Sequence, residues 1–179
     1  QAQQPGAPPD ALVGEPEPVD ATCVPPHLTG FRTLFQSFHH LGPQQAQAVL
    51  QDAVNRRVGI AIFENTHRHP GILLTFLLVP FAVLLFMPFA RPFSLRRLLL
   101  TYVVPVAPLV VLWDALVSCL RSYTPAELTQ MTQALDASGG PYLWQQGHAW
   151  QGIQCVSWLI GTPQPIAEPA PRPQVPPAA

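Results

Sequence analysis

A long apolar stretch, residues 71–120, constrains this chain more than any other feature of its sequence. Residues 71–90 contain no charged side chain, and residues 98–120 contain only one, Asp114. As an α-helix, the first of these segments would be about 30 Å long, which is the thickness of the hydrocarbon core of a bilayer. The sequence therefore predicts an apolar helical hairpin that associates with membrane lipid.

The loop between the two segments indicates how such a hairpin would meet the membrane. It carries Arg91, Arg96 and Arg97, and prolines on both sides would bend the helices. If both helices crossed the bilayer, the positive loop would lie in the cytoplasm and the rest of the chain outside. We expect the globular part to face the cytoplasm, so the sequence favours a kinked, shallow or re-entrant hairpin whose arginines contact lipid phosphates.

Two other structures would also explain the apolar stretch. The segments could be helices buried in the core of the chain, or they could form the interface of a soluble homodimer. The charged fraction of 11% is less than half of the roughly 25% typical of soluble domains. Much of the chain is therefore expected not to face water. The net charge of −1, without a basic stripe, argues against a nucleic-acid partner.

The spacing of cysteine and histidine does not predict a metal site. Cys23, Cys119 and Cys155 lie far apart and form no C-x-x-C pair, so we interpret them as buried, reduced thiols. His67 and His69 would need a third ligand, and the sequence near them offers none.

Both ends of the chain are rich in proline and poor in large apolar residues. Residues 1–18 and 163–179 are therefore predicted to be disordered. The folded domain is expected to comprise residues 19–70 and 121–162, on either side of the hairpin. Because the first residue is Gln rather than Met, we expect the chain to be a fragment of a longer protein or to be processed.

The first folded part has the pattern of a strand, a helix and a strand. Residues 31–38 are rich in aromatic and β-forming side chains, and residues 58–63 form a short apolar run. Between them, Pro43 suits the first turn of a helix, and apolar residues recur at helical spacing from Ala46 to Val54. A βαβ unit of this kind predicts a parallel sheet.

The second folded part predicts a helix followed by two strands. Thr124 and Glu127 have the spacing of a capping box, with Pro125 in the first turn. Residues 142–147 and 153–160 then read as a terminal antiparallel pair of strands.

The order of these elements resembles the second half of a class I S-adenosylmethionine-dependent methyltransferase, over about residues 19–163. The resemblance depends on five short motifs that occur in the expected order along the chain. They are Val19-Asp20-Ala21, Ser37-Phe38-His39-His40-Leu41, Phe63-Glu64, Thr124-Pro125-Ala126-Glu127-Leu128 and Leu159-Ile160-Gly161-Thr162-Pro163. The hairpin after Glu64 resembles a hydrophobic insertion found in a bacterial subgroup of these proteins. The implied fold class is α/β, a partial Rossmann-like sheet with an inserted apolar helical hairpin and a terminal antiparallel strand pair.

The resemblance also implies a cofactor, S-adenosylmethionine, and residues that would bind it. Asp20 takes the position of the acidic residue that meets the adenine amino group, with Ala21 beside it. Ser37 and Phe38 end the strand that borders the cofactor. A solvated turn is the alternative role for Asp20, and a place in the core is the alternative for Phe38.

Catalytic and substrate residues follow from the same comparison. His39 and His40 lie at the rim of the active site, where a histidine would act as a general base near neutral pH. The alternative is that one of them packs and the other is solvated. Glu64, Asp114 and Arg121 are candidates for contact with the substrate, although Asp114 and Arg121, seven residues apart, would also suit an ion pair on one helix face.

The sequence departs from the family in one respect. It contains neither the glycine-rich loop nor the second acidic residue that hold the cofactor in class I enzymes. Three hypotheses follow: part of a membrane-associated methyltransferase-like protein acting on an apolar small molecule, a non-catalytic membrane-anchored interaction module, and a soluble protein that dimerises through the hairpin.

Overall fold

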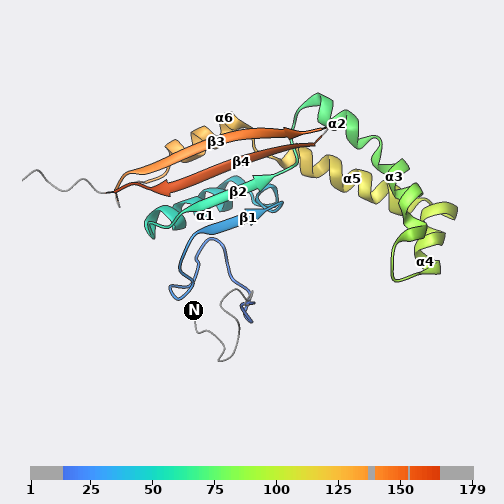
Figure 1. Cartoon of the computed structure of the whole chain (residues 1–179), viewed down its shortest axis with the longest axis horizontal. Coiled ribbons are helices and arrows are strands. Elements are labelled where there is room, and N and C mark those ends of the chain that lie inside the picture. The colour runs from blue at the N-terminus through green and yellow to red at the C-terminus, as the bar shows by residue number, and fades with distance from the viewer. Residues whose placement is uncertain (1–13, 137–139, 153, 166–179) are drawn as a thin grey trace, which may run out of the picture.

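The computed structural model describes residues 14–136, 140–152 and 154–165, and shows an α/β fold with a long helical arm (Figure 1). The strands form one mixed four-stranded sheet in the order β1-β2-β4-β3. In chain order the elements are β1 (Arg32–Phe35), the 3-10 helix η1 (Phe38–His40), α1 (Pro43–Asn55), β2 (Ile60–Glu64), α2 (Pro70–Phe76), α3 (Val79–Phe86), the 3-10 helix η2 (Met87–Phe89), α4 (Leu95–Leu98), the π-helix η3 (Leu99–Val103), α5 (Val106–Arg121), α6 (Pro125–Gln133), β3 (Tyr142–Gln151) and β4 (Gln154–Pro163).

The sheet combines a parallel and an antiparallel half. Strands β1 and β2 are parallel, with Leu34 opposite Ile62, and α1 connects them. Strand β4 returns antiparallel to β2, with Leu159 opposite Ile62, and pairs antiparallel with β3 on its other side. The predicted βαβ unit and the predicted terminal antiparallel pair are therefore confirmed.

The core lies between one face of the sheet and the helices α1 and α6. The helical stripe predicted for α1 is buried, since Ala46, Val49, Leu50, Ala53 and Val54 are all less than 4% exposed. The first four of these side chains pack in one cluster with Ile60, Ile62 and Leu159 from the sheet and with Leu128 from α6. Helix α6 begins at the predicted capping box, where the Thr124 side chain accepts from the Glu127 backbone N–H and the Glu127 side chain accepts from that of Thr124.

The strand boundaries differ from the prediction. The first strand ends at Phe35, because Gln36 adopts a φ of 51° that turns the chain into η1. The last two strands are longer than expected, covering 142–151 and 154–163. Residue 153, predicted to start the final strand, lies outside the described residues, as do 1–13 and 166–179 of the predicted disordered ends.

Helices α2 to α5 form an arm, residues 70–121, which extends from the end of the sheet at which β2 ends (Figure 1). The two predicted long helices are each divided into shorter segments. Pro70, Pro80 and Pro108 lie in the first turns of α2, α3 and α5, and Pro105 immediately precedes α5. This placement fits the missing N–H of proline, which breaks a helix internally but suits its start.

The arm leaves most of its large apolar side chains exposed. Phe89 is 76% exposed and Trp113 is 70% exposed, and α3 has no buried residue. The hypothesis that these helices are buried in the core of this chain is therefore wrong. The exposed arm residues are Leu74, Leu77, Leu78, Phe81, Leu85, Phe86, Phe89, Phe93, Leu95, Leu99, Tyr102, Val103, Val104, Val106, Leu109, Val110, Val111, Trp113 and Leu120.

Within the part of the chain that the structure describes, no individual helix combines the length and the apolar character needed to cross a bilayer. The segments Leu95–Val103 and Val106–Arg121 satisfy both conditions only as a pair, and they meet at an angle of 78°.

Candidate functional site

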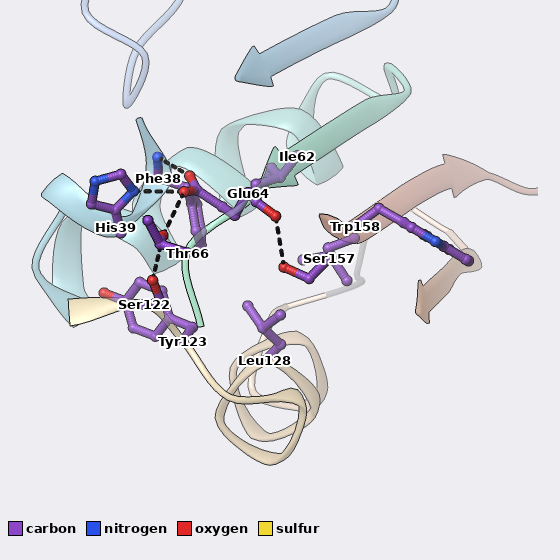
Figure 2. A pocket seen from close by; sticks show the side chains of 11 residues that line it. Phe38, His39, Ile62, Glu64, Thr66, Ser122, Tyr123, Leu128, Ser157 and Trp158 are labelled. Carbon is purple, nitrogen blue, oxygen red and sulfur yellow. Dashed lines mark hydrogen bonds and ion pairs between the residues drawn. The ribbon is translucent and has the colours of Figure 1, made fainter. Parts of the chain in front are cut away.

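His39 and Glu64 meet where the two parallel strands end. Glu64 is the last residue of β2, and the turn after β1 places His39 in η1 beside it. His39 Nδ1 lies 2.6 Å from Glu64 Oε2, and both side chains are buried (Figure 2). The carboxyl ends of parallel strands are the usual position for ligands in an open α/β sheet.

Several donors surround the buried Glu64 carboxylate. Its Oε1 accepts a hydrogen bond of 2.7 Å from the backbone N–H of Phe38. The Thr66 hydroxyl lies 3.5 Å from Oε2, and the Ser122 hydroxyl lies 2.6 Å from that of Thr66 (Figure 2). A buried carboxylate stays ionised only when such donors replace its lost hydration. Both oxygens of the Glu64 side chain therefore have hydrogen-bond partners in the structure.

This arrangement determines the tautomer of His39. An ionised carboxylate only accepts hydrogen bonds, so the proton of a neutral His39 ring resides on Nδ1 and the lone pair on Nε2. Among the described residues, His39 Nε2 has no hydrogen-bond partner. Every fully buried side-chain nitrogen or oxygen among these residues does have a partner. Nε2 is therefore not fully buried, although the His39 side chain is only 5% exposed. A histidine oriented by a carboxylate, with its other nitrogen open, has the geometry of a general base.

The second histidine lies against the first. The His40 ring is exposed, and its centroid is 4.2 Å from that of His39. The structure thus has one packed histidine and one solvated histidine at this rim. The catalytic roles assigned to both residues stay predictions.

The inner side of the pair has little free space. A cavity of about 20 Å³ lies there, lined by residues that include Tyr123, Leu128 and Ser157 (Figure 2). This volume holds about one water molecule. A molecule larger than water could therefore reach the pair only from its outer side.

The four predicted cofactor residues do not form a pocket in the structure. The Asp20 carboxylate accepts from the backbone N–H and the hydroxyl of Thr22, each at 2.8 Å, in an exposed turn. These bonds, the backbone one first, lower the pKa of Asp20. Phe38 is 2% exposed and packs in the core, Ala21 packs partly buried against it, and Ser37 is half-buried. The residues described here therefore do not fit S-adenosylmethionine by themselves, and that assignment stays a prediction.

Asp114 and Arg121 lie apart from each other on α5. Both are exposed, and neither has an ion pair or hydrogen bond within the described residues. The predicted ion pair between them is therefore absent. Helix α5 contacts η1, so the end of the helix that carries Arg121 belongs to the rim of the site. Asp114 lies two turns further out on the arm.

The sequence did not predict the roles of Thr66 and Ser122. Their hydroxyls connect the buried Glu64 to the end of α5, although they are 56 positions apart in the chain. The only signal in the sequence is that Thr66 lies two residues after Glu64. Such short polar sequences are common in loops, so the spacing alone does not predict a buried hydrogen bond.

The described residues contain no group of three or more His, Cys, Asp or Glu side chains placed to hold a metal ion. Comparison of the chain with protein families, curated proteins and solved structures finds no match.

Proposed function

We propose that this chain is a membrane-associated α/β domain whose apolar arm, residues 70–121, inserts shallowly into one leaflet. The observation that carries the proposal is the exposed apolar surface of the arm. Exposed apolar patches of this extent on a soluble monomer mark an interaction surface. Transfer of one Leu or Phe side chain out of water contributes about 1.5–3 kcal/mol, so a few of them are enough for stable partition into lipid.

A shallow position agrees with the shape and charges of the arm. The sharp angle between Leu95–Val103 and Val106–Arg121 suits a hairpin that enters and leaves on one side. Arg91, Arg96 and Arg97 lie between η2 and η3, where they would contact lipid phosphates. Asp114 is an exposed carboxylate on α5, and a charge in hydrocarbon is costly. In the proposed arrangement, the face of α5 that carries Asp114 therefore lies at the lipid head groups.

Flotation of the full chain with phospholipid vesicles tests this proposal. We expect the wild type to float with vesicles, and Phe89→Asp to reduce its partition at least tenfold. Phe35→Asp is the matched control, because Phe35 is 63% exposed on β1 and Phe89 is 76% exposed on the arm. The blue shift of Trp113 fluorescence should accompany binding. If the wild type does not bind vesicles but forms a dimer that Phe89→Asp dissociates, the soluble homodimer is correct instead.

The depth of insertion needs a separate measurement. In a chain whose three native cysteines, of which Cys23 is exposed, are replaced by serine, single cysteines introduced into the loop around Arg91 and Arg97 should react with a membrane-impermeant maleimide from the same side as the globular part. Labelling of the loop from only the far side of sealed vesicles would show that the hairpin spans.

A second candidate function, S-adenosylmethionine-dependent methyl transfer to an apolar small molecule, is favoured by the open Nε2 of His39. The βαβ unit followed by an antiparallel pair supports the resemblance to class I methyltransferases. His39 would remove the proton of the acceptor group at the edge of the sheet, while Glu64 holds the resulting imidazolium by its Nδ1–H. The arm would keep this edge beside the bilayer, from which the substrate arrives.

Methyl transfer from radiolabelled S-adenosylmethionine by the natural protein that contains this chain, assayed on lipid extracts, tests the second candidate. We expect His39→Gln to abolish transfer and to leave both vesicle binding and cofactor binding unchanged. If the natural protein binds vesicles but not the cofactor, the non-catalytic membrane-anchored interaction module is correct.

A further inference from the structure

We infer that a groove of about 640 Å³ at the root of the arm binds a membrane-derived amphiphile with an apolar body and an anionic head. The inference rests on the proposed membrane association for the source of the ligand. The volume lies within the range of roughly 300–1,000 Å³ that is typical of small-molecule sites.

Four segments that are distant in the sequence form most of this groove. Residues 67–69 immediately precede α2, residues 123–125 lead into α6, residues 146–150 belong to β3, and residues 155–158 belong to β4. The end of the β3–β4 hairpin lies beside the start of α2 (Figure 1). The groove therefore opens where the arm leaves the sheet, which is the level of the head groups if the arm lies in one leaflet.

Aromatic side chains supply the apolar part of the lining. They are Trp150, Trp158 and Tyr123, and Trp150 is 56% exposed although it lies on a strand. A Cβ atom at Gly147 would lie 2.5 Å from the ring of Trp158, so only glycine lets that ring lie flat against β3. Exposed aromatic faces of this kind bind the apolar part of a ligand and are common at membrane interfaces.

The ionisable groups of the groove favour an anionic head. Arg68, His67, His69 and His148 line it, and none of the described lining residues is a carboxylate. Nη1 of Arg68 donates to the Glu127 carboxylate at 2.9 Å, and the other guanidinium N–H groups have no hydrogen bond among the described residues. The charge pattern is complementary to a carboxylate or phosphate head.

The histidine beside the arm adds a second donor. Nδ1 of His69 accepts from the backbone N–H of Gly71 at 3.2 Å, so the proton of the neutral ring is on Nε2, which has no partner among the described residues. Arg68 and His69 are adjacent in the chain, and both residues line the groove. An anionic head therefore finds two hydrogen-bond donors there.

The test uses three probes with the same alkyl chain, each below its solubility limit or micelle concentration and without vesicles. They are dodecanoate, dodecan-1-ol and dodecyltrimethylammonium, and binding of each to the full chain is measured by calorimetry. We expect dodecanoate to bind at least tenfold more tightly than the ammonium compound. Equal or tighter binding of the ammonium compound would overturn the anionic assignment.

Variants locate the site and its charge. Arg68→Gln should weaken dodecanoate at least fivefold and leave dodecan-1-ol unchanged. Glu127→Gln should tighten dodecanoate, because glutamine retains the capping box while the charge that competes for Arg68 is removed. Trp150→Ala should weaken dodecanoate and dodecan-1-ol, whereas Trp113→Ala on the arm should weaken neither.

The alternatives give different results. If Trp113→Ala weakens dodecanoate as much as Trp150→Ala does, the probe binds the arm and the groove proposal is wrong. If the wild type does not float with vesicles but still binds dodecanoate tightly, only the proposal that the ligand comes from a membrane is wrong. Vesicle binding without dodecanoate binding would overturn the groove and leave the arm proposal standing.

Discussion

The imidazole of His39 is held by the carboxylate of Glu64 at 2.6 Å, in a part of the protein where both side chains are buried. The two residues are 25 positions apart in the chain, and they meet because β1 and β2 are parallel neighbours whose carboxyl ends lie at one edge. The pair thus connects the fold directly to the candidate chemistry.

Replacement of Glu64 by glutamine should reverse the tautomer of His39. The amide carbonyl would accept from the Phe38 N–H, while the amide N–H₂ would donate to Nδ1 and move the ring proton to Nε2. We expect a folded protein destabilised by about 1–3 kcal/mol, with the Nε2–H tautomer visible in ¹⁵N-labelled histidine spectra. Retention of the Nδ1–H tautomer would contradict the proposed orientation. Glu64→Ala leaves the N–H groups of Phe38 and His39 without an acceptor and should cost about 1–3 kcal/mol for each of them in urea unfolding.

The hydroxyls of Thr66 and Ser122 should act as a coupled pair. They are 2.6 Å apart and buried, and Ser122 is also 2.9 Å from the Ser118 carbonyl. We expect Thr66→Val and Ser122→Ala each to reduce stability by about 1–2 kcal/mol. In a double-mutant cycle their effects should differ from additivity by at least about 0.5 kcal/mol. Additive losses would show that the two hydroxyls are independent.

Local features of the sequence predicted the helices of the globular part well. The apolar spacing from Ala46 to Val54 determines which face of α1 is buried, and the capping box at Thr124 determines where α6 begins. Both signals lie within a few residues of the feature that they predict. The breaks in the arm were harder to predict, because hydropathy reports the absence of charge and not the straightness of a helix.

The candidate site depends on contacts that no local pattern encodes. His39 and Glu64 were predicted in separate roles, and only the register of β1 against β2 shows that they form a pair. The predicted Asp114–Arg121 ion pair failed for a simple geometric reason. Two turns of helix separate them by about 10 Å along the axis, which is too far for a short aspartate side chain to cross.

The arginines of the arm loop should make vesicle binding depend on lipid charge. Each basic residue near an anionic surface contributes about 1 kcal/mol. Replacement of Arg91, Arg96 and Arg97 by glutamine should therefore weaken binding to phosphatidylserine-rich vesicles roughly a hundredfold. Neutral phosphatidylcholine vesicles serve as the control and should show little change. Equal losses on both vesicle types would indicate damage to the arm instead.

Asp52 should make the protein less stable in acid. Burial alone would raise its pKa, but hydrogen bonds from Arg56 and Arg32, with a further one from the Val24 N–H, outweigh burial and lower the pKa below the ordinary 3.8. Because the pKa of Asp52 is lower in the folded state than in the unfolded chain, the ionised carboxylate stabilises the folded state above pH 3.8. This stabilisation is lost as the pH falls further. Asp52→Asn should cost about 1–3 kcal/mol near pH 7 and show a flatter acid dependence. The exposed Asp114→Asn is the control, and an identical acid curve for Asp52→Asn would contradict the role of the carboxylate.

Tyr142 should limit stability at the alkaline end. Its hydroxyl donates to the Val58 carbonyl at 2.6 Å, and burial, opposed by the nearby Arg32 charge, raises its pKa from 10.0 to about 12. Because the folded state holds this proton more tightly than the unfolded chain, its contribution is complete below pH 10 and is lost as the pH rises towards 12. The loss should reach roughly 2 kcal/mol in urea unfolding.

Tyr142→Phe should be less stable than the wild type by about 1 kcal/mol at pH 8, and it should lose less stability than the wild type between pH 8 and pH 12. Tyr123→Phe provides the comparison for Tyr142→Phe in the same unfolding measurements. Tyr123 is also half-buried, and its hydroxyl donates to the Leu41 carbonyl at 2.7 Å. If Tyr142→Phe and the wild type keep the same difference from pH 8 to pH 12, the alkaline loss has its origin elsewhere in the sheet.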